Sequence, residues 1–221
     1  MFKLNEMESK DLLAQPETGM GYQIVEATLR DNTKQRGTAY NAELLFLRNE
    51  GQIELRKNSY RDVLKSAPSS GNEIRALRVL PREAASLSSR VRDTSSVLKN
   101  ATPAKDAPIE KTETDEVFKR FTAFEDDKRR RSDGSWRDGT YATTEEDAKN
   151  VKTGTDAVAR YALPNILPAS NVFTGRPHKD TEIQKGIVAA EFGQPGGGIE
   201  VFFRKGTQPS TVTGPTKIPD K

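Results

Sequence analysis

The sequence predicts an α+β fold in two parts. A small α+β unit is expected over residues 1–92, and a larger domain with a mixed or antiparallel sheet over residues 116–221. Two observations support this prediction. Short apolar segments typical of strands alternate with a few short helical patterns. Between residues 93 and 115, Thr, Ser, Lys, Pro and Ala replace large apolar residues, so this segment is expected to be a linker or an exposed loop.

The composition limits the chemistry that the chain can perform. Of the 221 residues, 33% are hydrophobic and 30% charged, and the mean hydropathy is −0.75. This low apolar fraction indicates some linker or mobile tail, although the aromatic residues gather in clusters that can pack. The absence of cysteine excludes disulfides, thiolate metal sites and cysteine nucleophiles. The one histidine, His178, excludes a histidine metal cluster and argues against a Ser-His-Asp triad.

The termini and the charge balance give expectations about location and partners. No apolar run approaches the roughly 20 residues of a membrane-spanning helix, and the first residues lack the apolar core of a secretory signal. We therefore expect a chain without a membrane span that is cytoplasmic or exported by a dedicated secretion system. The net charge of +3 is a small excess rather than a clustered basic face.

In the N-terminal unit, residues 21–29 and 38–47 are expected to be strands connected by a turn within residues 31–37. The end of the second strand would also suit a helix. Three further elements are expected after it: a helix that begins at Ser59 and ends before Pro68, a strand over residues 74–80 and a helix over residues 83–91.

The C-terminal domain combines short strands with few helices. Thr144 and the acidic residues after it are typical of a helix start, and the helix is expected over residues 145–151. From Gly206 the chain is rich in Pro, Thr and Gly, so a tail that is mobile or lies along the surface is expected. Strands are expected over residues 117–124, 171–174, 186–190 and 199–203.

The most informative segment is Phe192-Gly193-Gln194-Pro195-Gly196-Gly197-Gly198, directly before a strand. Its glycines allow positive φ angles and a close approach of the backbone to a ligand. Gln194 would stand at the tip of a stiff turn, where its amide can both donate and accept hydrogen bonds. The alternative is a Gly-rich hairpin whose glutamine is merely solvated. The segment matches neither a phosphate-binding P-loop nor a dinucleotide fingerprint.

Residues 139–203 resemble the tuberculosis-necrotizing-toxin class of NAD glycohydrolases, which are similar to the ADP-ribosyltransferase fold. The resemblance rests mainly on the Gly-rich segment. It also includes Gly139-Thr140-Tyr141, Leu163-Pro164 and Val172-Phe173-Thr174 in the same order. It implies a toxin-like effector that cleaves the nicotinamide–ribose bond of NAD(P) with water as acceptor. It implies no cofactor beyond NAD(P) as substrate, and an inhibitory immunity protein as partner.

The resemblance also implies functional residues. Gln194 is expected in the catalytic site near the scissile bond, and Arg120 is expected to hold the diphosphate through its planar guanidinium. The alternative for Arg120 is a solvated strand residue, and Arg160 and Arg176 are lesser candidates for the same task. The further substrate contacts that we expect are Tyr141 by stacking, Thr143 and Thr144 by hydrogen bonds to ribose, and Gly193, Gly196 and Gly197 by close backbone approach.

Several of these residues have a plainer alternative. Tyr141 would also suit the core, and one of the two threonines would also suit a helix cap. The family's histidine position holds Ser170-Asn171 here, and His178 has no place in the pattern.

Hydrolysis is favoured over transfer to a protein, because Gly196 stands two residues after Gln194, where transferases of the wider fold carry an acidic residue. Glu200 is expected to be structural. The alternatives are a mono-ADP-ribosyltransferase toxin and a non-catalytic NAD- or nucleic-acid-binding protein. The nucleic-acid alternative rests on the basic segment Lys128-Arg129-Arg130-Arg131 and on Trp136, which would contact the phosphate backbone. The acidic residues Glu125-Asp126-Asp127 directly precede this segment and would weaken its positive potential. A solvated charged loop is therefore the favoured interpretation.

Overall fold

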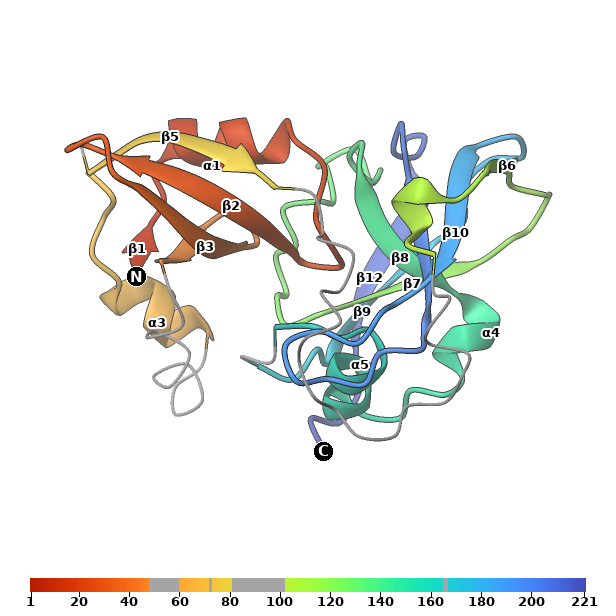
Figure 1. Cartoon of the computed structure of the whole chain (residues 1–221). Coiled ribbons are helices and arrows are strands. Elements are labelled where there is room, and N and C mark those ends of the chain that lie inside the picture. Colours follow the sequence, from red (N-terminus) through yellow and green to blue (C-terminus); the bar gives the residue numbers. More distant parts are fainter. Residues whose placement is uncertain (48–59, 72, 81–101, 165–166) are drawn as a thin grey trace.

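The computed structural model describes residues 1–47, 60–71, 73–80, 102–164 and 167–221. Within these residues the chain is an α+β protein with two antiparallel sheets and few short helices (Figure 1). This agrees with the predicted fold class. The helix expected over residues 83–91 lies outside the described residues, as does the first part of the expected linker, up to residue 101.

The N-terminal sheet has five strands in the order β1-β4-β3-β2-β5. Helix α1 (Glu6–Leu13) covers one face of it, and the two pack through a buried apolar cluster that includes Leu12, Val25 and Leu45. Helix α1 begins at Asn5, whose side chain forms a capping box with Glu8. The other elements of this part are β1 (Phe2–Lys3), β2 (Tyr22–Leu29), β3 (Lys34–Tyr40), β4 (Leu44–Leu47), α3 (Tyr60–Ser66) and β5 (Ile74–Val79).

One prediction for this sheet was wrong. Residues 38–47 do not form one strand, because the chain reverses at Asn41 and Ala42, which have φ angles of 51° and 50°. Positive φ at two consecutive residues is the geometry of a tight hairpin turn. The reversal places β3 and β4 side by side, with Tyr40 opposite Leu44. The pattern of apolar residues continues through the turn, which is why the sequence alone suggested a single strand.

The second sheet has seven strands in the order β12-β9-β7-β8-β11-β10-β6, and each adjacent pair is antiparallel. Its strands are β6 (Ile109–Lys111), β7 (Phe118–Thr122), β8 (Thr140–Thr144), β9 (Asn171–Gly175), β10 (Glu182–Ile187), β11 (Ile199–Phe203) and β12 (Val212–Lys217). Helices α4 (Glu145–Ala148) and α5 (Gly154–Arg160) lie between β8 and β9. Strand β10 both begins and ends earlier in the chain than the strand that we expected over residues 186–190.

Two segments that we expected to be irregular are part of this sheet. The described end of the 93–115 segment contains a 3-10 helix, η3 (Ala104–Asp106), and strand β6, which pairs with β10. The C-terminal tail contains β12, which pairs with β9 despite an irregularity in register between Thr213 and Thr216. Composition could not show this, because an edge strand needs few large apolar side chains when backbone pairing holds it.

The two sheets are connected through shared apolar packing. A buried cluster includes Tyr22, Ile24 and Phe46 of the first sheet together with Phe121 and Tyr161 of the second half. A further cluster lies within the second sheet, around Trp136, Phe173 and Phe203. No helix in the described part of the chain combines the length and apolar character needed to cross a membrane.

Candidate functional site

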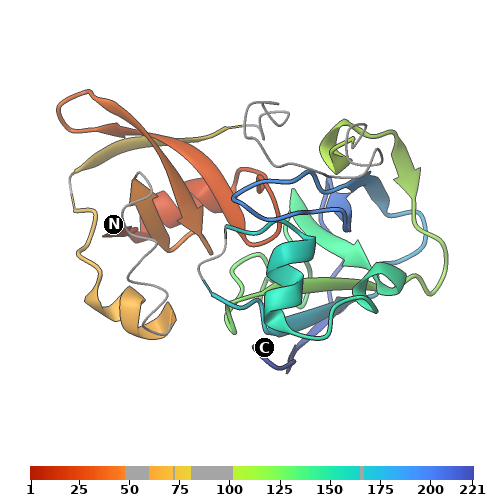
Figure 2. The same cartoon turned by 60° about the horizontal axis from the view of Figure 1, so that its bottom comes forward.

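The Gly-rich segment forms the loop between β10 and β11. Phe192 and Gly193 have φ angles of 53° and 75°, and they connect Glu191 and Gln194, whose backbones exchange hydrogen bonds of 2.8 and 3.2 Å. This is the geometry of a two-residue hairpin turn. Figure 2 shows this blue loop reaching toward the orange strands of the first sheet, where the Phe192 ring meets the Tyr22 ring edge-on at 5.5 Å. Gln194 is half-buried directly after the turn.

The three consecutive glycines pack against the chain itself. Gly196 and Gly198 each donate a backbone hydrogen bond of 3.0 Å, to the carbonyls of Ala159 and Arg160 at the end of α5, and Gly197 donates to Val188 at 2.8 Å. A Cβ at Gly196 would lie 2.6 Å from the Val188 carbonyl oxygen. The close backbone approach expected at Gly196 and Gly197 therefore serves protein packing. Gly193 differs, since nothing lies within 4 Å of the corresponding Cβ position.

Asp147 organises a polar cluster beside this loop. Its buried carboxylate accepts hydrogen bonds from Nε and Nη2 of Arg160, at 3.0 and 2.5 Å, and from the Tyr161 hydroxyl at 3.1 Å. Thr143 Oγ1 donates a longer bond of 3.3 Å to the same carboxylate. The bonds to Asp147 raise the pKa of Arg160, and burial raises the pKa of the Tyr161 phenol. The cluster therefore holds Arg160 as a cation in a defined orientation.

Arg160 is the candidate arginine that the fold places beside the Gly-rich loop. Its carbonyl holds Gly198, and its side chain is 30% exposed. No described residue accepts a hydrogen bond from its Nη1 atom. With respect to the part of the chain that the structure describes, Nη1 is thus available to contact an anion.

Arg120 does not have this freedom. Its side chain is 1% exposed, and all five of its N–H groups donate hydrogen bonds within the protein. The acceptors are the carboxylates of Glu17 and Asp127 and the carbonyl of Tyr141. Burial alone would lower the pKa of Arg120, but Asp127 and Glu17 outweigh it and raise the pKa. The diphosphate role that we expected for Arg120 does not fit this geometry.

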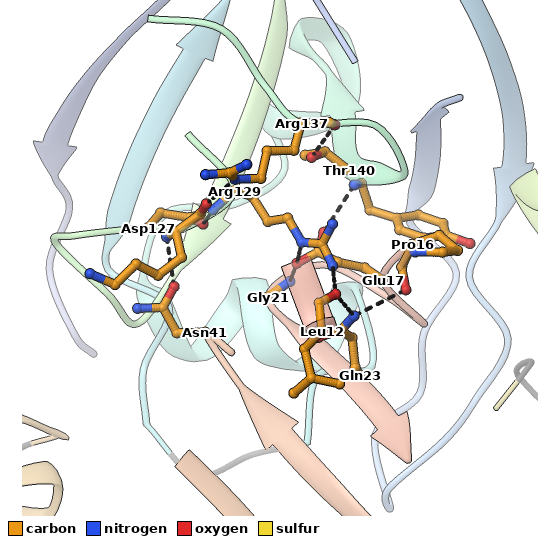
Figure 3. Close-up of polar contacts among 12 residues, drawn as sticks. Leu12, Pro16, Glu17, Gly21, Gln23, Asn41, Asp127, Arg129, Arg137 and Thr140 are labelled. Atoms are coloured by element: carbon orange, nitrogen blue, oxygen red, sulfur yellow. Dashed lines mark hydrogen bonds and ion pairs between the residues drawn. The ribbon is translucent and has the colours of Figure 1, made fainter. Parts of the chain in front are cut away.

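Glu17 and Arg129 extend the same buried network. Arg129 donates from Nη2 to the Gln15 carbonyl at 2.7 Å and lies 3.7 Å from a Glu17 carboxylate oxygen. Figure 3 shows the Arg129 side chain directed toward Glu17 and Leu12. Burial lowers the pKa of Arg129. Two arginines and two carboxylates thus tie the segment before β2 to β7 and the loop that follows β7.

The remaining predicted contacts are placed elsewhere. Tyr141 is buried with its ring against Phe202, at 4.9 Å, so the core alternative applies. Thr144 caps α4 by accepting a hydrogen bond from the Asp147 N–H. Arg176 is exposed after β9, and its backbone N–H bonds to Thr211. None of its hydrogen bonds or ion pairs with described residues brings Arg176 to the Gly-rich loop.

The basic segment before Trp136 is not the solvated loop that we expected. Arg129 is buried in the network described above, and Lys128 pairs with Asp126 and Glu43. Trp136 is fully buried, so it is not available to stack on a base. A nucleic-acid interface built on these residues therefore lacks its aromatic partner.

Two of the acidic side chains that organise this region, Asp147 and Glu17, were not identified from the sequence. Asp147 carried a signal, because it stands three residues after Thr144 in a helix-start pattern, but the pattern does not indicate what the carboxylate contacts. No local pattern in the sequence marks Glu17, because it follows Pro16 in a loop and contacts Arg120 only in the folded chain.

Within the described residues, no group of three or more histidine or acidic side chains is placed to hold a metal ion. No protein-family model matches the chain, and no curated protein or solved structure is significantly similar to it.

Proposed function

We propose that the chain is an NAD(P) glycohydrolase that hydrolyses the nicotinamide–ribose bond, with Gln194 and Arg160 as the principal substrate-binding residues. The observation that carries the proposal is the attachment of the Gly-rich loop to the end of α5. The bonds from Gly196 and Gly198 to Ala159 and Arg160 make the loop and the helix end one unit. A glutamine amide and a partly exposed guanidinium then belong to the same packed region.

The reaction suits such a site. Nicotinamide leaves NAD as a neutral molecule because its ring nitrogen is cationic while bound, so the departure needs no general acid. The ribose passes through a transition state with oxocarbenium character, as in glycoside hydrolysis. Positioning of the ribose and electrostatic stabilisation therefore supply the catalysis. Gln194 would accept a hydrogen bond from a ribose hydroxyl, and Arg160 would hold the diphosphate in the place of Arg120.

The surroundings of Glu200 support hydrolysis over transfer to a protein. Glu200 is buried, and its carboxylate accepts a hydrogen bond of 2.9 Å from the Ala104 N–H. This carboxylate therefore anchors η3 instead of facing a substrate. With Gly196 in the position of the transferase acid, water is the proposed acceptor.

A nicotinamide-release assay on the full chain tests the proposal. The chain is expected to release free nicotinamide from NAD or NADP, and Gln194→Ala is expected to reduce the rate by about 100-fold, the typical loss when one stabilising donor or acceptor is removed. Gln35→Ala is the matched control, because Gln35 is a half-buried glutamine of the first sheet. Absence of release by the wild-type chain would refute the function. Equal rates in the two variants would refute the role of Gln194.

A further inference from the structure

A groove lined by cationic side chains lies between α1 and the second sheet. It consists of two cavities of about 530 and 330 Å³ that share Ala14 and Asp138 in their walls. Lys10, Arg131 and Arg137 line the larger cavity, and Lys105 and Arg204 line the smaller one. We call this pair of cavities the cationic groove.

Positive charge dominates the groove. Its five cations face the carboxylates of Glu6 and Asp138, and Asp138 is already paired with Arg131 at 3.1 Å. Lys10, Lys105 and Arg204 are exposed, and their charged groups make no ion pair or hydrogen bond with any described residue. Cations without a partner attract anions when they converge on a concave surface, where the field is focused.

Arg137 adds a second reason to expect an anion. Its Nε donates a hydrogen bond of 2.9 Å to the Lys128 carbonyl, whereas its two terminal nitrogens have no acceptor among the described residues. Partial burial and the like charge of Arg131 both lower the pKa of Arg137. An anion placed between Arg131 and Arg137 would relieve this repulsion, and a guanidinium fork matches the oxygens of a phosphate.

The geometry points to the cationic groove as a binding site for a small molecule that carries two or more phosphate groups. Each cavity has the volume of a small-molecule site. Because cations line both cavities, phosphate groups spaced along one ligand would contact a cation in each cavity. Leu13 and Pro16 supply apolar wall for an attached organic group. The groove shares no lining residue with the Gly-rich loop. The cationic groove is therefore separate from the proposed NAD(P) site, and its assignment goes beyond the proposed function.

Titration calorimetry with inorganic tripolyphosphate tests this site on the full chain. Saturable binding to one site is expected, and it should weaken as salt is added. Arg204→Gln and Lys10→Gln each remove one exposed cation, one from each cavity. Each is expected to weaken binding about 10-fold, the effect of one lost charge-assisted hydrogen bond. Lys152→Gln is the control, because Lys152 is an exposed lysine outside both cavities, and it should leave the affinity unchanged.

Three results would overturn the assignment of the cationic groove. The first is a lack of saturable binding, and the second is equal affinity in all three variants. The third comes from a second arm, which compares ATP with a ten-nucleotide single strand of thymidine. Tight binding of the strand without binding of ATP or tripolyphosphate would assign the groove to nucleic acid instead of a small molecule. The readout is heat of binding, so it is independent of whether the chain releases nicotinamide.

Discussion

The carboxylate of Glu17 receives two parallel hydrogen bonds of 2.8 Å from Nη1 and Nη2 of Arg120, a residue 103 positions later in the chain. Both side chains are almost fully buried. A bidentate pair of this kind is among the stronger polar contacts in proteins. Glu17, which precedes β2, thus neutralises the charge of Arg120 in the centre of the second sheet. The stability of the second sheet therefore depends on the N-terminal part of the chain.

Loss of the Glu17 charge should therefore destabilise the whole chain. Glu17→Gln is expected to lower the free energy of unfolding by about 3–5 kcal/mol, because it leaves buried arginines without sufficient negative charge. Urea unfolding monitored by circular dichroism measures this. Glu26→Gln is the control. Glu26 pairs with Lys34 and Arg78 near the surface, so a loss of about 1 kcal/mol or less is expected there. Similar losses in both variants would contradict the buried-pair argument.

The same dependence predicts the behaviour of the C-terminal part alone. A fragment of residues 102–221 would keep Arg120 and Arg129 but lose Glu17, and it would expose the core residues that pack on the first sheet. We expect it not to fold cooperatively. Proton–nitrogen correlation spectra of the fragment and the full chain would show this as a collapse of amide dispersion. A dispersed spectrum of the fragment would refute the prediction.

Gly196 tests how tightly the Gly-rich loop is held. Gly196→Ala is expected to cost about 1–2 kcal/mol for the positive φ and about 1–3 kcal/mol more for the overlap with the Val188 carbonyl. Gly71→Ala separates the two effects, since Gly71 also has a positive φ but nothing lies within 4 Å of its Cβ position. Thermal unfolding of both variants gives the comparison. Equal losses of stability would show that the loop does not pack against Val188.

The hydrogen bonds to the Asp156 carboxylate predict that the stability of the folded chain depends on pH. The Lys152 and Thr153 N–H groups, at 3.1 and 2.9 Å, and the Thr153 side chain lower the pKa of Asp156 below its usual 3.8. A carboxyl whose pKa is lower in the folded state than in the unfolded state stabilises the folded state at pH values above the unfolded-state pKa. This contribution is lost as the pH falls through the folded-state pKa. The stability difference between wild type and Asp156→Asn should therefore shrink on acidification. A difference that is independent of pH would contradict it.

Arg160 gives a prediction that rests on the proposed function. Arg160→Lys keeps the charge but loses the planar fork, so it should raise the KM for NAD about 10-fold while changing kcat less. Arg176→Lys is the control, because Arg176 is exposed and no described contact joins it to the loop. A KM that is unchanged in Arg160→Lys would remove Arg160 from the diphosphate role. That result would not affect the proposed glycohydrolase activity, which nicotinamide release by the wild type tests separately.

Local patterns in the sequence identified β2, β7 and β11, because alternating or continuous apolar residues are enough to indicate a strand. They also identified the start of α4 at Thr144, where the cap is three residues from its partner Asp147. They missed the turn at Asn41 and Ala42, where apolar residues continue through a reversal, and strand β12, which backbone pairing stabilises. Strand β12 depends on a partner, β9, that is distant in the sequence.

The sequence by itself determined the α+β class and the positions of strands β2, β5, β7, β9 and β11, because each follows from residues within a few positions of one another. Only the tertiary structure decided that Arg120 is a buried structural cation and that Arg160 is the arginine beside the loop. The physical reason is that an arginine's role depends on which carboxylates surround it. Glu17 reaches Arg120 from 103 residues away only when the two sheets pack together.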